Sequence, residues 1–126
     1  MEIRVKTDQG AYDIEASVRR IGQDLLVAVW GGEKPHIGAV AAAHPRPSLK
    51  DPDTTSATAS VICFTGHKED DLAKTVSQKL PSVLKTNVVV TAGIHWDDLT
   101  TEGICQVVEN SRVLTDLIVD RILGGS

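Results

Sequence analysis

The sequence is short of aromatic residues, of cysteine and of long apolar runs. It contains four aromatic residues and two cysteines in 126 positions, so a site built from stacked rings has few candidates and a disulfide scaffold is excluded. No apolar run approaches the roughly 20 residues of a membrane-spanning helix. The 13 Lys and Arg are scattered and are outnumbered by 17 Asp and Glu, for a net charge of −4. We therefore expect neither a membrane nor a nucleic acid as partner.

The composition fits one compact domain. Apolar residues make up 41% of the chain and charged residues 24%, which is enough to bury a core and keep the surface polar. We expect a single domain over residues 1–126. The first residues lack the apolar stretch of a secretion signal, so we expect a cytoplasmic protein.

The two cysteines carry no pattern of their own. Cys63 and Cys105 are far apart, and neither has a partner at the spacing of a zinc or redox motif. Cys63 lies in an apolar segment and Cys105 in an amphipathic one. We therefore predict that both are small buried packing residues.

The first half of the chain reads as strands. Apolar and polar residues alternate over residues 3–5 and 12–19, and residues 24–30 form a nearly continuous apolar run that suits a strand covered on both faces. These three segments predict an antiparallel meander. Further strands are expected over residues 37–43 and 57–64, separated by a proline-rich loop over residues 44–56.

Helical spacing enters only in the second half. Apolar residues recur every four positions after Gly66 until Pro81, where we expect the helix to stop. A β-branched strand follows over residues 87–92 and runs on toward Trp96.

The last helix is expected to begin at Thr100 as N-cap. Its packing face is predicted to hold six apolar residues: Ile104, Val107, Val108, Leu114, Ile118 and Ile122. This broad apolar surface could also serve a dimer. Five strands, a helix, a strand and a helix predict an α+β domain with a mainly antiparallel sheet of about six strands.

Three short segments combine glycine with polar side chains. In the first, GGEKPHIG (residues 31–38), glycines admit close backbone approach, and Lys34 and His36 supply hydrogen-bond donors. A ligand-binding loop and a Gly-Gly hairpin with a capping histidine both explain this segment.

The other two segments leave similar alternatives. Gly66, His67 and Lys68 stand at an expected helix start, where an anion could bind, although the acidic residues that follow equally suit a capped surface helix. Gly93, Ile94, His95 and Trp96 place a histidine and a large ring at the carboxyl end of a strand. This is either a ligand position or a strand-end histidine packed by tryptophan.

No pattern indicates catalysis or metal binding. The sequence lacks a Gly-x-Ser-x-Gly elbow and a paired-carboxylate frame, and no two histidines are three or four residues apart. The residues thus favour a binding module over an enzyme. An enzyme using His36 or His95 as general base remains compatible with them.

Together the three segments resemble a known family. In this order and spacing, GGEKPHIG, GHKE (residues 66–69) and TAGIH (residues 91–95) resemble the prenylated-flavin chaperones, the small D-type subunit associated with gallate decarboxylase. The resemblance also implies the fold of the proteasome-assembly chaperones, which pair as dimers.

The resemblance implies a function without catalysis. The protein would bind prenylated FMN made by a flavin prenyltransferase, or FMN itself. Acting as a homodimer, it would pass the cofactor to a UbiD-type decarboxylase. The alternative is a protein-interaction module like the proteasome-assembly chaperones, serving the assembly of another complex.

The chemistry of a flavin phosphate and ring suggests roles for the residues of the three segments. Glycines would let the backbone close on the ligand, Lys34 and His36 would bind the phosphate or a flavin carbonyl, and the helix start would hold the phosphate. His95 would donate to the ring, with Trp96 as a wall. The predicted cofactor-binding residues are Gly31, Gly32, Lys34, His36, Gly38, His67, Lys68, Gly93, His95 and Trp96.

Overall fold

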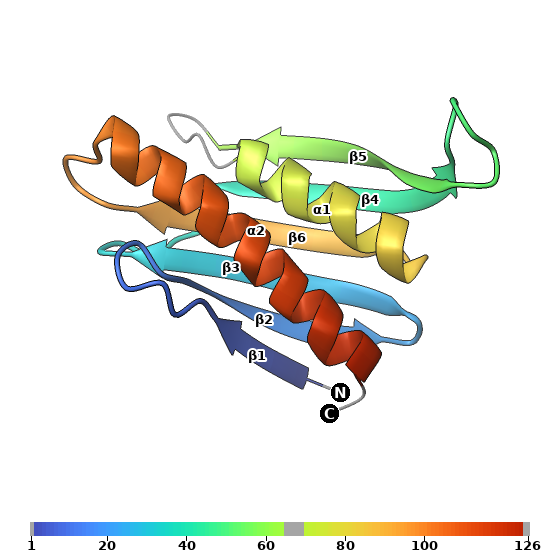
Figure 1. Ribbon diagram of the computed structural model, residues 1–126, viewed down its shortest axis with the longest axis horizontal. Helices are drawn as coiled ribbons and strands as arrows, with labels where there is room; N and C mark the ends of the chain where they lie inside the picture. Colours follow the sequence, from blue (N-terminus) through green and yellow to red (C-terminus); the bar gives the residue numbers. More distant parts are fainter. Residues whose placement is uncertain (1, 65–69, 125–126) are drawn as a thin grey trace.

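The computed structural model describes residues 2–64 and 70–124 as one sheet with two helices (Figure 1). The elements in chain order are β1 (Glu2–Lys6), β2 (Ile14–Ile21), β3 (Asp24–Gly32), β4 (Ala39–Pro47), β5 (Thr55–Cys63), α1 (Asp70–Leu84), β6 (Val88–His95) and α2 (Thr101–Gly124). This order confirms the predicted α+β arrangement. None of the described helices is long and apolar enough to span a membrane.

The six strands form one mixed sheet in the order β1-β2-β3-β6-β4-β5. The first three strands form the predicted antiparallel meander, and β4 pairs antiparallel with both β5 and β6. The one parallel pair is β3 with β6, at the centre of the sheet. Because β6 lies between β3 and β4, the segment that joins those two strands has to cross the carboxyl end of β6.

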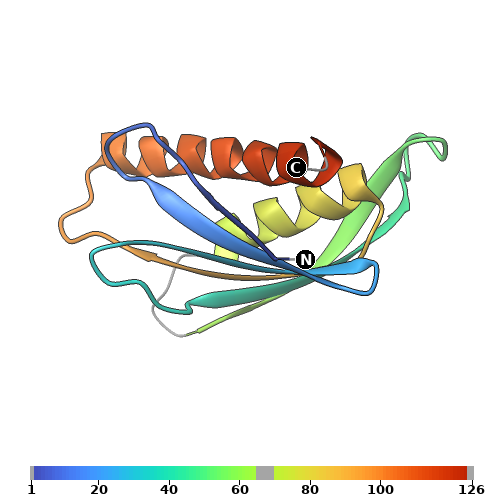
Figure 2. The same ribbon diagram turned by 90° about the horizontal axis from the view of Figure 1, so that it is seen from below.

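Both helices cover the same face of the sheet, and no other described residues form a layer on the opposite face (Figure 2). On the helix side, Val18, Val27 and Val90 from β2, β3 and β6 are fully buried together with Leu114 and Ile118 of α2. Along β3 the burial alternates, and Leu26 is 39% exposed. The prediction that this strand is covered on both faces was therefore wrong.

Prolines that were predicted to end a strand and a helix lie within these elements instead. The expected loop over residues 44–56 shrinks to residues 48–54, because β4 runs on through Pro45 and Pro47. This is possible because the pairing of β4 with β6 ends at Ala43, so beyond it β4 has β5 as neighbour on one side alone. Similarly, α1 does not stop at Pro81 but continues to Leu84.

Several side chains lie elsewhere than predicted. Cys63 and Cys105 are exposed cysteines, not buried packing residues. In α2, Ile104 and Val108 are about half exposed, since the helix turns its buried stripe through Val107, Leu114 and Ile118 instead. The prediction thus holds for Val107, Leu114 and Ile118, which are buried, and for Ile122, which packs against the core while partly exposed.

One cap fixes the start of α2, and one buried amide joins the helix to the segment between β1 and β2. Thr100 Oγ1 accepts a hydrogen bond from the backbone N–H of Gly103 at 3.0 Å, which confirms the predicted N-cap. The fully buried Asn110 donates to the carbonyls of Ala11 and Tyr12 at 3.2 and 2.6 Å. Tyr12 itself lies before β2 with a φ of 61°, so the strand begins two residues later than predicted.

Candidate functional site

The first and third glycine-containing segments meet at the carboxyl ends of β3 and β6. Gly32 pairs with His95 in the parallel ladder. The connecting segment, residues 33–38, is fixed at both ends, since the N–H of Glu33 donates to the His95 carbonyl at 2.7 Å and that of Gly38 to the Ala92 carbonyl at 2.9 Å. Two motifs some 60 positions apart in sequence therefore form one site.

Two glycines allow this close approach of one chain segment to another. A Cβ on Gly93 would lie 1.6 Å from the carbonyl oxygen of His36, and one on Gly32 would lie 2.1 Å from that of His95. Gly32 also has a φ of 91°, which disfavours any other residue. The close packing of the chain therefore explains why glycine stands at positions 32 and 93. The contact of these glycines with a ligand stays a prediction.

Segment 33–38 crosses β6 on the face that the helices leave open. Val90 and Ala92 of β6 are buried on the helix side, so Gly93 and His95 face the other way. The missing side chain of Gly93 leaves the space that His36 backbone atoms occupy. Figure 2 shows the β3–β4 connection on the side of the sheet away from the helices.

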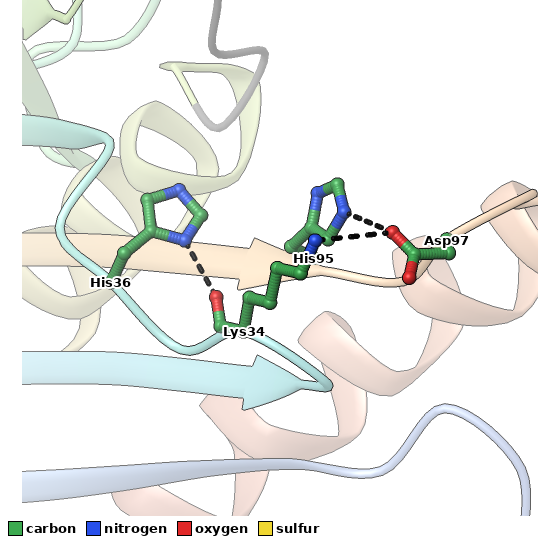
Figure 3. Close-up of polar contacts among 4 residues, drawn as sticks. All are labelled: Lys34, His36, His95 and Asp97. Carbon is green, nitrogen blue, oxygen red and sulfur yellow. Dashed lines mark hydrogen bonds and ion pairs between the residues drawn. The ribbon is translucent and has the colours of Figure 1, made fainter.

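Four side chains with hydrogen-bonding groups gather at this corner (Figure 3). Asp97 Oδ1 lies 2.9 Å from His95 Nε2 and 3.7 Å from Lys34 Nζ. His36 Nδ1 lies 2.9 Å from the carbonyl oxygen of Lys34, to which it donates. Because an ionised carboxylate accepts hydrogen bonds alone, Nε2 of His95 carries the proton shared with Asp97.

Asp97 is a residue of this site that the sequence analysis did not single out. A hydrogen bond from His95, a second side-chain hydrogen bond with Glu33, and the charge of Lys34 lower the pKa of its carboxyl group from the usual 3.8. The carboxylate therefore holds the His95 ring in one orientation. A histidine at a strand end followed two positions later by an aspartate was the available signal in the sequence.

The two tryptophans lie on opposite sides of the sheet. Trp96 packs against the hydrophobic core, and its ring meets that of Tyr12 edge to face at 5.2 Å. Its predicted role as a wall of the ligand site stays untested, while its packing role is plain. Trp30, which was not predicted as a site residue, is partly buried on the open face, where its Nε1 donates to Glu15 at 3.0 Å and Arg4 lies over its ring.

Two predicted site residues cannot be placed. His67 and Lys68, with Gly66, fall outside the described residues. Among residues 2–64 and 70–124 no three or more histidine, cysteine, aspartate or glutamate side chains gather to hold a metal ion. The described part of the site is therefore a set of imidazoles, one ammonium group and two carboxylates at a sheet edge.

Comparison with known proteins identifies the family of this chain. Residues 8–123 match the family described as the prenylated flavin chaperone LpdD-like domain. The chain is also 30% identical over 122 residues to Protein LpdD of Lactiplantibacillus plantarum, covering 90% of this chain and 79% of that protein. The chain therefore belongs to the LpdD-like prenylated flavin chaperone family.

A solved structure supports the fold. The chain superposes with a TM-score of 0.51 on a chain of a structure titled "Crystal Structure of a Novel Chaperone Complex for Yeast 20S Proteasome Assembly". The match covers 91% of this chain and 98% of the other, at 8% sequence identity. It confirms the predicted likeness of fold to a proteasome-assembly chaperone, and at this identity it concerns the fold alone.

Proposed function

We propose that this protein holds prenylated FMN at the carboxyl ends of β3 and β6 and delivers it to a UbiD-type decarboxylase. Membership of the prenylated flavin chaperone family is the observation that supports this proposal. The supplier of the cofactor would be a flavin prenyltransferase. No reaction on the flavin is required of the chain itself.

The described side chains suit the polar edge of a flavin ring better than its phosphate. Asp97 holds the His95 ring at 2.9 Å, which prepares an imidazole nitrogen to meet a ring carbonyl or N–H. Lys34 is the cation that the described residues bring to this corner, but Asp97 lies 3.7 Å from its ammonium group and Glu33 also contacts Asp97. With two carboxylates for one ammonium, the phosphate needs a further cation, and His67 and Lys68 are the predicted ones.

The proposal is tested by binding. Purified protein is titrated without oxygen with reduced prenylated FMN or plain FMN, and flavin retention is measured after desalting. We expect the prenylated form to be retained preferentially, and His95→Ala to weaken its binding by about tenfold, the equivalent of one charge-assisted hydrogen bond. His44→Ala is the matched control, because His44 lies at the opposite end of the open face. Equal loss in both variants would contradict the site.

Delivery is tested separately. Loaded protein is mixed with an apo form of a UbiD-type decarboxylase in air, beside an equal amount of free reduced cofactor. The proposal predicts more decarboxylase activity from the loaded protein, because a bound flavin is shielded from oxygen. Equal or lower activity would show that the protein does not act as a carrier for that enzyme.

A second candidate function follows from the His95–Asp97 pair. A histidine oriented by a carboxylate is the arrangement that a general base uses. Mass analysis of the flavin released after incubation separates the two functions. An unchanged flavin supports the carrier, and a product of different mass would establish an enzyme.

We further propose that the carrier is a cytoplasmic homodimer. Ile104 and Val108 of α2 are exposed apolar residues that a second copy could cover, and the exposed thiols of Cys63 and Cys105 suit a reducing compartment. A monomeric mass by light scattering would exclude the dimer. Recovery of proteasome subunits instead of a decarboxylase with the tagged protein would favour the assembly-module alternative.

A further inference from the structure

On the open face of the sheet, an area without charged residues extends over β3, β6, β4 and β5. Strand pairing fixes which residues are neighbours there. The area, here called the uncharged face, consists of Leu26, Ala28 and Trp30 of β3, Val89, Thr91 and Gly93 of β6, Val40 and Ala42 of β4, and Ser60 and Ile62 of β5. An exposed area of this kind, which no described residues cover, is typical of a surface that binds a ligand or a protein partner.

Charged side chains lie along the borders of the uncharged face, and at one border Arg4 reaches over the Trp30 ring. Arg4, Glu15 and Arg19 lie beside it on β1 and β2, and His44 follows at the far end of β4. Glu15 and Arg4 also hold the Trp30 indole toward β2 and β1. This orientation draws the largest ring of the open face away from β6.

The centre of the uncharged face is flat because its side chains are small. Ala28, Thr91 and Val40 are direct neighbours across β3, β6 and β4, so over these three strands the row presents nothing larger than valine, and the exposed Ile62 of β5 continues it beside Val40. The next row carries larger residues, with Leu26 and Val89 each almost 40% exposed. At the other end, segment 33–38 rises over Gly93 and forms a border.

The size of this area distinguishes between a ligand and a protein partner. With strands about 4.8 Å apart and about 3.3 Å per residue, it measures roughly 14 by 13 Å. That is about a quarter of the roughly 800 Å² that each partner contributes to a stable protein interface. Segment 33–38 also stands in the way of a second sheet, which packs flat at about 10 Å.

The groups at the border of the uncharged face complement a ring with polar edges. His95 and Asp97 lie at the end of β6 directly beyond Gly93, and Lys34 and His36 lie on segment 33–38. One end of the area therefore offers donors and acceptors, and its floor offers apolar and hydroxyl-bearing side chains. A planar ligand with an apolar body and one polar edge meets both.

We propose that the row Ala28, Thr91 and Val40 is the floor on which the planar ring of the ligand lies, with its polar edge toward His95. The ligand class is a fused, flat heteroaromatic ring, and this inference rests on the proposed function in taking that ring to be the prenylated flavin. It assigns to the site three residues of the open face that contain no titratable group.

The test places larger side chains in the row Ala28, Thr91 and Val40. Thr91→Leu and Ala28→Leu each put a larger side chain where the ring would lie, and Thr58→Leu makes the same change as the first on the open face beside His44. Affinity for reduced prenylated FMN and for FMN is measured by titration without oxygen. We expect both floor variants to lose tenfold or more in affinity, and Thr58→Leu to stay within twofold of the unsubstituted protein.

Other outcomes would overturn the inference in distinguishable ways. If the unsubstituted protein binds neither flavin, the proposed function fails and this inference with it. If flavin binds and neither floor variant weakens it, the carrier function stands and the floor lies elsewhere. If a floor variant converts a dimer into a monomer in light scattering while thermal unfolding shows it folded, the face is covered by a second copy and no ring lies there.

Discussion

At the scale of single residues, the site depends on positions where a side chain is absent. Gly93 and Gly32 let segment 33–38 and the end of β6 come within backbone contact distance. Without that approach His36 and Lys34 would not lie beside His95. The glycines of the motif therefore shape the site even before any ligand is considered.

Substitution of Gly93 is expected to be costly. In Gly93→Ala the new methyl group would meet the His36 carbonyl, which is backbone and cannot turn aside. We predict a loss of about 2 to 3 kcal/mol in the free energy of unfolding, measured with urea. Gly10→Ala is the control, because nothing lies within 4 Å of its added Cβ, although its φ of 99° makes some loss certain. A smaller loss for Gly93→Ala than for Gly10→Ala would contradict the role of close approach.

The Asp97 carboxyl group gives a prediction about pH. Its pKa is lowered in the folded protein, so its interactions with His95 stabilise the fold above the unfolded value of 3.8 and are lost as the pH falls through the lower folded value. Titration followed by NMR should place the pKa of Asp97 below 3.8. His95→Ala should raise that pKa more than Lys34→Ala does, since the hydrogen bond from His95 is the largest cause. The reverse order would contradict the geometry of the pair.

At the scale of elements, one buried amide joins α2 to the segment between β1 and β2, in addition to the apolar packing of the helix on the sheet. Asn110 donates to two carbonyls in the segment between β1 and β2, and its own Oδ1 accepts from Gln106 at 2.8 Å. The same segment positions Tyr12 against Trp96. The orientation of the helix and the packing beneath the end of β6 are therefore linked.

Asn110→Ala should reveal this link. It removes a fully buried amide and leaves two partly buried carbonyls without their donor, for which we expect a loss of about 2 kcal/mol in unfolding free energy. Gln106→Ala is the control, because it leaves both bonds to the carbonyls intact. Chemical denaturation measures both, and equal effects would show that the two carbonyls find other partners.

The N-cap of α2 gives a smaller expected effect. Thr100→Ala removes the oxygen that accepts from the Gly103 N–H and should cost about 1 kcal/mol. Thr101→Ala, one residue further along, removes no cap and should cost less. Thermal unfolding of the two variants checks the difference, and a larger loss for Thr101→Ala would assign the cap elsewhere.

The types of the elements could be predicted from the sequence, whereas their covered faces could not. Alternation and helical spacing are local, so the strand and helix order was accessible. Whether β3 has one covered face or two depends on where both helices pack, and residues 24–30 contain no information on that. The continuation of β4 through Pro45 likewise depends on which strands lie beside it.

The site shows the same division between local and distant information. GGEKPHIG and TAGIH are visible as motifs, but their contact follows from the parallel pairing of β3 with β6, which joins residues about 60 positions apart. Asp97 was missed because its importance arises from the direction of its side chain toward His95 and Lys34. The Trp30 environment was missed because Glu15 and Arg4 belong to other strands.

At the scale of the whole molecule, residues 2–64 and 70–124 form two layers, one of helices and one sheet, and leave the other face of that sheet uncovered (Figure 2). The helix side supplies the stability of the fold, since the buried apolar residues gather there. The open side carries the corner of Lys34, His36, His95 and Asp97 together with the uncharged face. This separation leaves the open side available for a ligand and for its transfer.

The decisive measurement is an anaerobic titration of the protein with reduced prenylated FMN, with plain FMN as the control. We predict that the protein retains the prenylated form through desalting and releases the flavin chemically unchanged. We also predict that His95→Ala and Thr91→Leu weaken its binding while His44→Ala and Thr58→Leu do not. Retention of neither flavin would contradict the carrier function, and the exposed surfaces would then have to be explained by protein partners.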